Sequence, residues 1–272
     1  MADPLLPGPL WLVGCGNMAG AMLARWIEDG VDPAHVSVIR PSGAPCGDGI
    51  RVTTDFPEDE VPAIVLLGMK PHQLDVAAPG LAPILDPETI LVSILAGVEL
   101  ASLRARFPKP RTIIRAMPNL PVRIGKGAIG LASDSDDIAA KALITGLMAT
   151  LGHAEWFETE SGFQLAGHLT GAGPAFLFRF IDALAAGAGR LGLPFDQAQR
   201  LALKMVEGAA ALAAVSDDDP EALARRVASP RGTTEAGLAV LDADRALLDL
   251  VERTLEASLA RGLEMAAEAR ER

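Results

Sequence analysis

The sequence lacks an excess of positive charge, a supply of cysteines and any long uninterrupted apolar run. Its 24 Lys and Arg stand against 35 Asp and Glu, a formal net charge of −11, so there is no positive excess to neutralise the phosphates of a nucleic acid. Two cysteines cannot build a disulfide framework, which favours a reducing compartment. The first residues lack the basic segment of a signal peptide. Gly, Pro or charge interrupts each apolar run before the ~18 residues that a membrane span needs. We expect a cytoplasmic protein that binds neither nucleic acid nor membrane.

Metal-ligating clusters are also missing, whereas material for a core is plentiful. The four histidines, His35, His72, His153 and His168, are scattered along the chain, so we predict no metal site. Half of the 272 residues are hydrophobic and 22% are charged, which excludes disorder as the main state. At roughly 100–200 residues per domain, the length allows one large domain or two ordinary ones.

The first part of the chain alternates short apolar runs with helical patterns. Such runs suit strands buried on both faces of a parallel sheet built from βαβ units. The predicted strands are Leu10–Val13, Val36–Ile39, Ile64–Leu67, Ile90–Ile94, Thr112–Ile114 and Ala128–Leu131. The stretch Arg40–Asp55 is rich in Gly and Pro and is predicted to be a loop rather than a helix.

From Gln164 onward the pattern becomes helical. Gly173-Pro174 is expected to open a helix that Gly192 closes, because proline suits the first turn and glycine the residues after the last. Further helices are expected after an N-cap at Asp196, from Asp219-Pro220, and over residues 243–271. The sequence thus predicts an α/β domain over residues 1–157 and an all-α domain over 158–272.

A glycine-rich motif follows the first predicted strand. It reads G-x-G-x-x-A from Gly14 and leads into an amphipathic helix. The first glycine permits a tight turn and the second lets the backbone approach a pyrophosphate, which the helix N-terminus then binds. We assign cofactor binding to Gly14, Gly16, Asn17 and Met18. A purely structural turn is the alternative.

The second predicted strand ends without an acidic residue. An acid there would bind the ribose 2′-hydroxyl of NAD. The chain instead has Arg40 and Ser42, which suit a 2′-phosphate and favour NADPH over NADH, although NADH is possible. A solvated loop arginine is the alternative.

Five further segments have residue patterns that helix, strand or core formation alone does not explain. They are Gly68–Gln73, Ser93–Val98, Ile114–Pro121, Leu169–Phe176 and Ala228–Gly237. Together with the glycine motif, they resemble the pyrroline-5-carboxylate reductase family, in its order and at its spacing. The resemblance implies a Rossmann domain over 1–157. It also implies an all-α substrate-binding and dimerisation domain over 158–272, like the C-terminal domain of 6-phosphogluconate dehydrogenase. The implied reaction is hydride transfer from NAD(P)H to the C=N bond of 1-pyrroline-5-carboxylate, which gives L-proline.

A turn that enters a helix offers a nest of N–H groups and hydroxyls for the substrate carboxylate. The resemblance assigns this role to Ser229, Gly232, Thr233 and Thr234, with helix capping as the alternative. Thr170 is expected to precede a turn at 171–173 and to meet the ring nitrogen as a proton-relaying or orienting hydroxyl.

The resemblance also assigns residues at the imine and the nicotinamide. Glu160 matches an acidic family position and is a second catalytic candidate, or else a surface carboxylate at the domain boundary. Further substrate contacts are assigned to Gly171 and Ala172. Cofactor contacts are assigned to Met69, Lys70, Pro71, Leu95, Ala96, Gly97 and Asn119. For Asn119, a turn residue without ligand contact is the alternative.

The sequence departs from the family pattern at several places. Ala172 and Phe176 replace a serine and a tyrosine, and Arg231 replaces a glycine. Arg231 either touches an anion or points to water from an ordinary backbone torsion. The small residues of Ala183–Gly189 suit close helix packing. The resemblance implies that this packing forms a homodimer or higher homo-oligomer, and packing against the chain's own first domain is the alternative.

Two other functions share this two-domain plan. A β-hydroxyacid dehydrogenase would need a catalytic lysine on the first long helix of the second domain, and none lies between Lys141 and Lys204. A non-catalytic nucleotide-sensing protein would explain the altered residues at 172, 176 and 231.

Overall fold

The structure is a computed structural model that describes residues 5–270. The chain forms two compact units. The sheet unit holds the described residues up to Ala172 and those from Leu259 onward, and the helical unit is Gly173–Ser258. The division of the chain at 157/158 stays a prediction.

An eight-stranded sheet in the order β3-β2-β1-β4-β5-β6-β7-β8 forms the sheet unit. All neighbouring strands run parallel except β6 and β7. The strands are β1 (Leu10–Val13), β2 (Val36–Ile39), β3 (Arg51–Thr53), β4 (Ile64–Leu67), β5 (Ile90–Ser93), β6 (Thr112–Met117), β7 (Gly127–Ser133) and β8 (Gly152–Trp156). The predicted bounds of β1, β2 and β4 are confirmed. β5 ends one residue earlier than predicted, and β6 and β7 are longer. β3 and β8 were not predicted.

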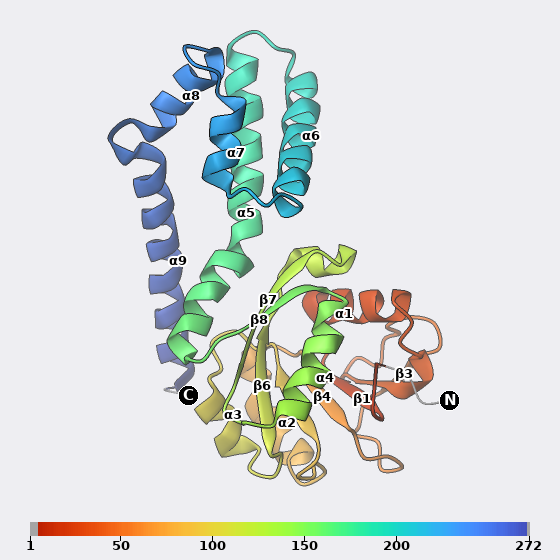
Figure 1. Cartoon of the computed structure of the whole chain (residues 1–272). Coiled ribbons are helices and arrows are strands. Elements are labelled where there is room, and N and C mark those ends of the chain that lie inside the picture. The colour runs from red at the N-terminus through yellow and green to blue at the C-terminus, as the bar shows by residue number, and fades with distance from the viewer. Residues whose placement is uncertain (1–4, 271–272) are drawn as a thin grey trace. The chain divides into compact units, whose positions relative to one another are not determined.

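Helices cover both faces of this sheet (Figure 1). One face packs against α1 (Asn17–Glu28), η3 (Leu120–Ile124) and α4 (Ile138–Ala149), and the other against α2 (Leu74–Leu81) and α3 (Leu100–Arg106). Two short 3₁₀ turns, η1 (Pro33–His35) and η2 (Pro71–Gln73), precede β2 and α2. The apolar faces of β1, β4 and β5 contribute to both layers of core, which explains their continuous apolar sequences. This arrangement confirms the predicted Rossmann-like class.

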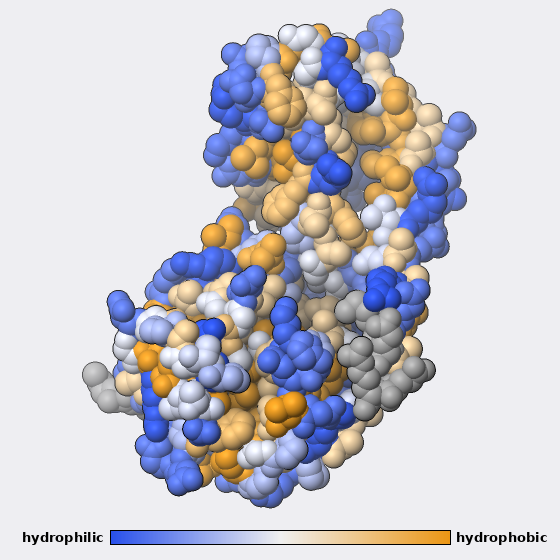
Figure 2. Space-filling view, turned by 180° about the vertical axis from the view of Figure 1, so that it is seen from behind, coloured by the Kyte–Doolittle hydropathy of each residue, from blue (hydrophilic) through white to orange (hydrophobic). Residues whose placement is uncertain are grey.

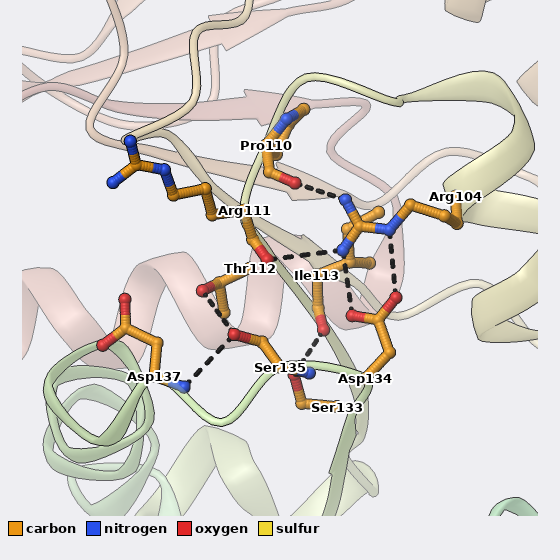
Figure 3. Close-up of polar contacts among 9 residues, drawn as sticks. All are labelled: Arg104, Pro110, Arg111, Thr112, Ile113, Ser133, Asp134, Ser135 and Asp137. Carbon is orange, nitrogen blue, oxygen red and sulfur yellow. Dashed lines mark hydrogen bonds and ion pairs between the residues drawn. The ribbon is translucent and has the colours of Figure 1, made fainter.

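A polar cluster fixes β7, whose direction opposes that of β6 (Figure 3). Arg104 of α3 makes a two-pronged ion pair with Asp134, with N–O distances of 3.0 and 2.9 Å. The hydroxyl of Ser133 donates to the carbonyl of Ile113 at 2.7 Å. The Ser133 bond ties the end of β7 to the start of β6, and the ion pair ties the residue after β7 to α3. The cluster thus holds in place the strand that leads to Asn119.

Two predicted helix starts in the helical unit are wrong. Its helices are the part of α5 (Glu160–Arg190) from Gly173 onward, α6 (Phe195–Ala214), α7 (Pro220–Val227), α8 (Thr233–Asp242), the 3₁₀ turn η4 (Ala243–Arg245) and the first part of α9 (Ala246–Arg270). The N-cap of α6 is Pro194, and Asp196 lies inside the first turn, where it binds Arg200. The last helix starts at 246 because Asp244 and Arg245 have positive φ angles, and the predicted end at 271 lies outside the described residues. The predicted opening of α7 at Asp219-Pro220 is confirmed.

Helix α5 (Glu160–Arg190) corrects a further expectation. It runs without interruption through Gly171, Gly173 and Pro174. The expected turn at 171–173 and the expected helix start at Gly173-Pro174 are therefore wrong. Gly192 does follow its end, with φ +107°. Pro174 leaves the carbonyl of Thr170 without its helical partner, and the side chain of Asn119, which follows β6, donates to that carbonyl at 3.0 Å.

The helices of the second unit expose many apolar side chains, and Figure 2 shows orange residues gathered over them. Among the exposed residues are Phe178, Phe180, Leu201, Leu212 and Val240. Within the described residues, α5 is the one helix that is long and apolar enough to cross a membrane, a test that core helices of soluble proteins also pass. A helical surface of this kind is typical of an interface between protein chains.

Candidate functional site

The glycine motif forms a tight turn between β1 and α1. Gly14 has φ +86°, and a Cβ there would lie 2.6 Å from the backbone nitrogen of Met69. A Cβ on Gly68 would similarly lie 2.7 Å from the Cβ of Ala19. Both positions therefore require glycine, so that the end of β4 can pack against the turn. Gly68 begins the segment Gly68–Gln73, but the sequence alone indicates no role for this glycine.

The start of α1 is open to a ligand. Gly16 is its N-cap, no side chain caps it, and its first turn contains no acidic residue. Gly16 and Asn17 are exposed, and Met18 is half-buried. Free N–H groups with the positive end of the helix dipole fit the pyrophosphate of a dinucleotide. The residues present thus fit the expected cofactor.

The strand order reverses between β1 and β4, and ligands of such sheets bind at the carboxyl ends of the strands beside this reversal. The segments that follow the strand ends are the predicted ones: Arg40 and Ser42 after β2, Met69–Pro71 after β4, and Leu95–Gly97 after β5. Ala96 is exposed and Gly97 half-buried, whereas Leu95 is buried in the core. Ala96 and Gly97 are therefore the accessible part of the last segment.

The loop after β2 is held by β3 and by a cysteine. The backbone N–H of Arg40 donates to the carbonyl of Thr53 at 3.0 Å, and its Nη1 lies 3.2 Å from Sγ of Cys46. Cys46 also contacts Cys15 of the glycine motif, and burial together with this contact raises the pKa of the Cys15 thiol to about 12. Cys15 is thus a neutral thiol near neutral pH and not an activated nucleophile.

Lys70 closes the turn after β4. Its backbone N–H donates to Oε1 of Gln73 at 3.0 Å, and its carbonyl accepts from the N–H of Gln73 at 2.9 Å. Both backbone groups of Lys70 are therefore used inside the turn, and its side chain is exposed. This rigid turn sets the path of the backbone from Met69 to Pro71.

The carboxylate of Glu160 has a partner that the sequence did not reveal. It forms an ion pair with Arg115 of β6, whose side chain is 3% exposed. Arg115 also lies over the ring of Phe163, 4.6 Å from its centre. Burial lowers the pKa of Arg115, and Glu160 opposes this shift. Glu160 is thus engaged within the sheet unit. A lone arginine inside an apolar strand is the signal that could have indicated such a pair.

Asn119 and Thr170 are brought together by the fold. Nδ2 of Asn119 donates to the backbone carbonyl of Thr170 at 3.0 Å, and its Oδ1 accepts from the N–H of Ala128 at 3.0 Å. The hydroxyl of Thr170 donates to the carbonyl of Ala166 at 3.0 Å. The fold therefore gives Asn119 protein partners on both sides of its amide.

The segment 229–234 enters α8 as expected. Gly232 is the N-cap, no side chain caps the helix, and the N–H of Gly232 donates to the carbonyl of Ser229 at 2.9 Å. Thr233 and Thr234 form the first turn. Arg231 has φ +59°, and its N–H donates to Oε2 of Glu235 at 2.6 Å. No side chain caps the helix start, which suits an anion, although its first turn contains the carboxylate of Glu235. The torsion of Arg231 is not ordinary.

The candidates divide between the two units. Those for the cofactor lie in the sheet unit with Thr170, Gly171, Ala172 and Glu160, whereas those for the carboxylate lie in the helical unit. Within residues 5–270, no group of three or more His, Cys, Asp or Glu is placed to hold a metal ion.

The family model and the curated relatives indicate the same family. The model of the pyrroline-5-carboxylate reductase dimerisation family matches residues 160–265. Two curated relatives are pyrroline-5-carboxylate reductases. That of Pseudomonas aeruginosa is 34% identical over 93% of this chain and 95% of its own length. That of Synechocystis is 36% identical over 86% of this chain and 89% of its own.

Solved structures of pyrroline-5-carboxylate reductases are also similar to this chain. A pyrroline-5-carboxylate reductase from Coxiella burnetii is similar with a TM-score of 0.87 and 30% identity, over 94% of this chain and 98% of that one. A pyrroline carboxylate reductase from Plasmodium falciparum, solved with NADP bound, has the same fold with a TM-score of 0.82 and 21% identity, over 96% and 98% of the two chains.

Proposed function

The chain belongs to the pyrroline-5-carboxylate reductase family, and we propose which of its residues bind the cofactor, the substrate carboxylate and the imine. The protein is an NAD(P)H-dependent oxidoreductase that reduces 1-pyrroline-5-carboxylate to L-proline, the last step of proline biosynthesis. The observation that carries this function is the match to a curated pyrroline-5-carboxylate reductase over 93% of this chain and 95% of that protein's length.

The turn between β1 and α1 binds the pyrophosphate of the cofactor through Gly14, Gly16, Asn17 and Met18. Its uncapped helix start and the open space beside Gly16, where a Cβ would have no atom closer than 4.0 Å, support this. The accessible backbone of Ala96 and Gly97 and the turn at Met69–Pro71 border the nicotinamide, with Leu95 beneath Ala96 and Gly97 in the core. When bound, the nicotinamide supplies the hydride.

The coenzyme that the site prefers is NADPH. Arg40 follows β2 where an acidic residue would select NAD, and Cys46 and Thr53 fix its position. A guanidinium beside the hydroxyl of Ser42 suits a 2′-phosphate.

The substrate carboxylate binds at the start of α8. Its ligands are the N–H groups and hydroxyls of Thr233 and Thr234. Gly232, whose N–H donates to the carbonyl of Ser229, forms with Ser229 the turn that lies against the carboxylate. The absence of a capping side chain leaves these donors for an anion.

Thr170 meets the ring nitrogen. Its hydroxyl proton is used by the carbonyl of Ala166, so its oxygen is free to accept the N–H of the protonated imine. Gly171 and Ala172 border the ring. A protonated imine is already electrophilic, so binding and orientation supply much of the acceleration without a strong acid. Glu160 contributes by holding Arg115 rather than by donating a proton.

The protein assembles with copies of itself through the region that the dimerisation family matches. The exposed apolar side chains of the helical unit support a homodimer as the smallest assembly. The negative net charge supports the absence of a nucleic-acid partner. A biosynthetic role supports the cytoplasm, without a membrane partner.

Steady-state oxidation of NADPH by the purified protein tests the function, with 1-pyrroline-5-carboxylate as substrate and 3-hydroxy acids with NADP⁺ as control. Turnover with the imino acid alone, and proline as product, is expected. Tight NADPH binding without turnover would instead favour a nucleotide-sensing protein.

The carboxylate site has its own test. Thr234→Ala should raise the substrate KM about ten-fold, because charge-assisted bonds are lost, and leave the Kd of NADPH unchanged. Thr254→Ala in α9, where the hydroxyl donates only to the carbonyl of Leu250 at 2.7 Å, is the control. Equal losses for substrate and cofactor would contradict the assignment.

A further inference from the structure

Proline inside α5 removes one hydrogen bond of the helix. Each helical carbonyl normally accepts from the N–H four residues later, and Pro174 has none. The carbonyl left without that partner is the carbonyl of Thr170. The Nδ2 of Asn119 donates to this same oxygen at 3.0 Å and so replaces the missing bond.

The surrounding helix has little rigidity of its own. Gly171 and Gly173 lie on either side of residue 172, and a Cβ on either would have nothing within 4 Å. Glycine weakens a helix and proline strains the preceding turn. The orientation of Thr170 therefore depends on contacts from outside α5.

Those contacts come from β6 and the extended residues that follow it. Arg115 binds Glu160, Met117 packs on Gly167, and Asn119 binds Thr170. Residues 115, 117 and 119 alternate with the period of two expected of extended backbone, which persists at Asn119 with φ −127° and ψ 169°. Asn119 is only 7% exposed, and its Oδ1 is fixed by the N–H of Ala128. It is a rigid donor.

We propose that Asn119 is a positioning residue for imine reduction: it binds the Thr170 carbonyl that Pro174 leaves without a helical partner, and thereby fixes the Thr170 hydroxyl against the ring nitrogen. This rests on the proposed role of Thr170. It assigns Asn119 an effect on the chemical step, in place of the contact with cofactor that the sequence suggested.

The test is a double-mutant cycle in which a backbone N–H replaces a side-chain N–H. Asn119→Ala should lower kcat at least about ten-fold, since small displacements of a positioned group are costly, with the Kd of NADPH unchanged. Pro174→Ala restores an N–H four residues after Thr170. The double variant should therefore regain most of the activity of Pro174→Ala alone. A double variant as slow as Asn119→Ala overturns the proposal, and so does a weakened Kd of NADPH in Asn119→Ala.

Asn119→Asp supplies a second readout if the alanine variant folds poorly. A carboxylate cannot donate to the Thr170 carbonyl, but a protonated carboxyl can. The ratio of its kcat to that of the wild type should rise as pH is lowered, and a flat ratio contradicts the proposal. Inactivity of the wild type itself with the imino acid would refute the proposed function instead, so the two failures are distinguishable.

Discussion

Arg115, buried in β6, and Glu160, the first residue of α5, form an ion pair that joins the sheet to the helix carrying Thr170. Phe163, one turn into α5, lies under the guanidinium with its ring centre 4.6 Å away. A buried guanidinium needs a partner, since an unpaired charge away from water is costly. The pair therefore fixes the start of α5 on the sheet.

Removal of Glu160 should destabilise the protein. Glu160→Ala leaves Arg115 buried without its carboxylate, and we expect a loss of about 2 kcal/mol in the free energy of unfolding, because Glu160 itself is partly exposed. Glu160→Gln keeps an oxygen acceptor and should lose less. Urea unfolding measures both.

The same variants separate a structural role from proton donation. With folded protein at matched concentration, Glu160→Gln should keep most of its kcat. A catalytic acid would give the opposite pattern, with near-native stability, a large fall in kcat and loss of one limb of the pH profile.

The strands that the sequence predicted are those buried on both faces, where an unbroken apolar run is required. β3 and β8 lie at the two edges of the sheet, and the burial of β8 alternates between half-buried and exposed. Edge strands need no apolar run, so their sequences carry little signal. β3 is in addition only three residues long, and the segment that contains it is rich in glycine.

The site was predictable where a local motif determines it. The turn at Gly14 and the helix start at Gly232 follow from short segments of sequence. The bonds of Glu160 and Thr170 depend on partners 45 and 51 residues away, so no local pattern contains them. The sequence predicts a helix start at Pro174, because the Asn119 bond that replaces the missing helical hydrogen bond cannot be recognised from the sequence.

Gly14 and Gly16 should respond differently to alanine. At Gly14, φ is +86° and the new Cβ would meet the backbone of Met69 at 2.6 Å, so Gly14→Ala should lose more than about 1 kcal/mol of stability. At Gly16 the nearest atom is 4.0 Å away, so Gly16→Ala should fold normally. Its methyl group would nevertheless occupy the approach of the pyrophosphate, and the Kd of NADPH should rise about ten-fold or more. Thermal unfolding and NADPH titration of both variants provide the check. Unchanged NADPH binding in Gly16→Ala would argue against a phosphate site here.

Arg40→Asp should shift coenzyme preference. A carboxylate repels a 2′-phosphate and accepts from a 2′-hydroxyl, so the KM of NADPH should rise at least about ten-fold while that of NADH falls or stays constant. Arg51→Ala in β3, which removes an exposed ion pair with Asp59, is the control and should leave the ratio unchanged. An unchanged ratio in Arg40→Asp would remove Arg40 from the cofactor site.

Arg231→Gly should stabilise the protein. Arg231 has φ +59°, a conformation that costs a side chain-bearing residue roughly 1–2 kcal/mol and costs glycine little. Part of this gain is offset by the greater freedom of glycine in the unfolded chain, so a net gain of about 0.5–1 kcal/mol is expected in urea unfolding. The matched control is Arg225→Gly inside α7, where the same change should cost about 1 kcal/mol. The N–H of residue 231 would still donate to Glu235, so the substrate KM should not change. A loss of stability, or a raised KM, would mean that the arginine side chain itself holds the turn or binds the anion.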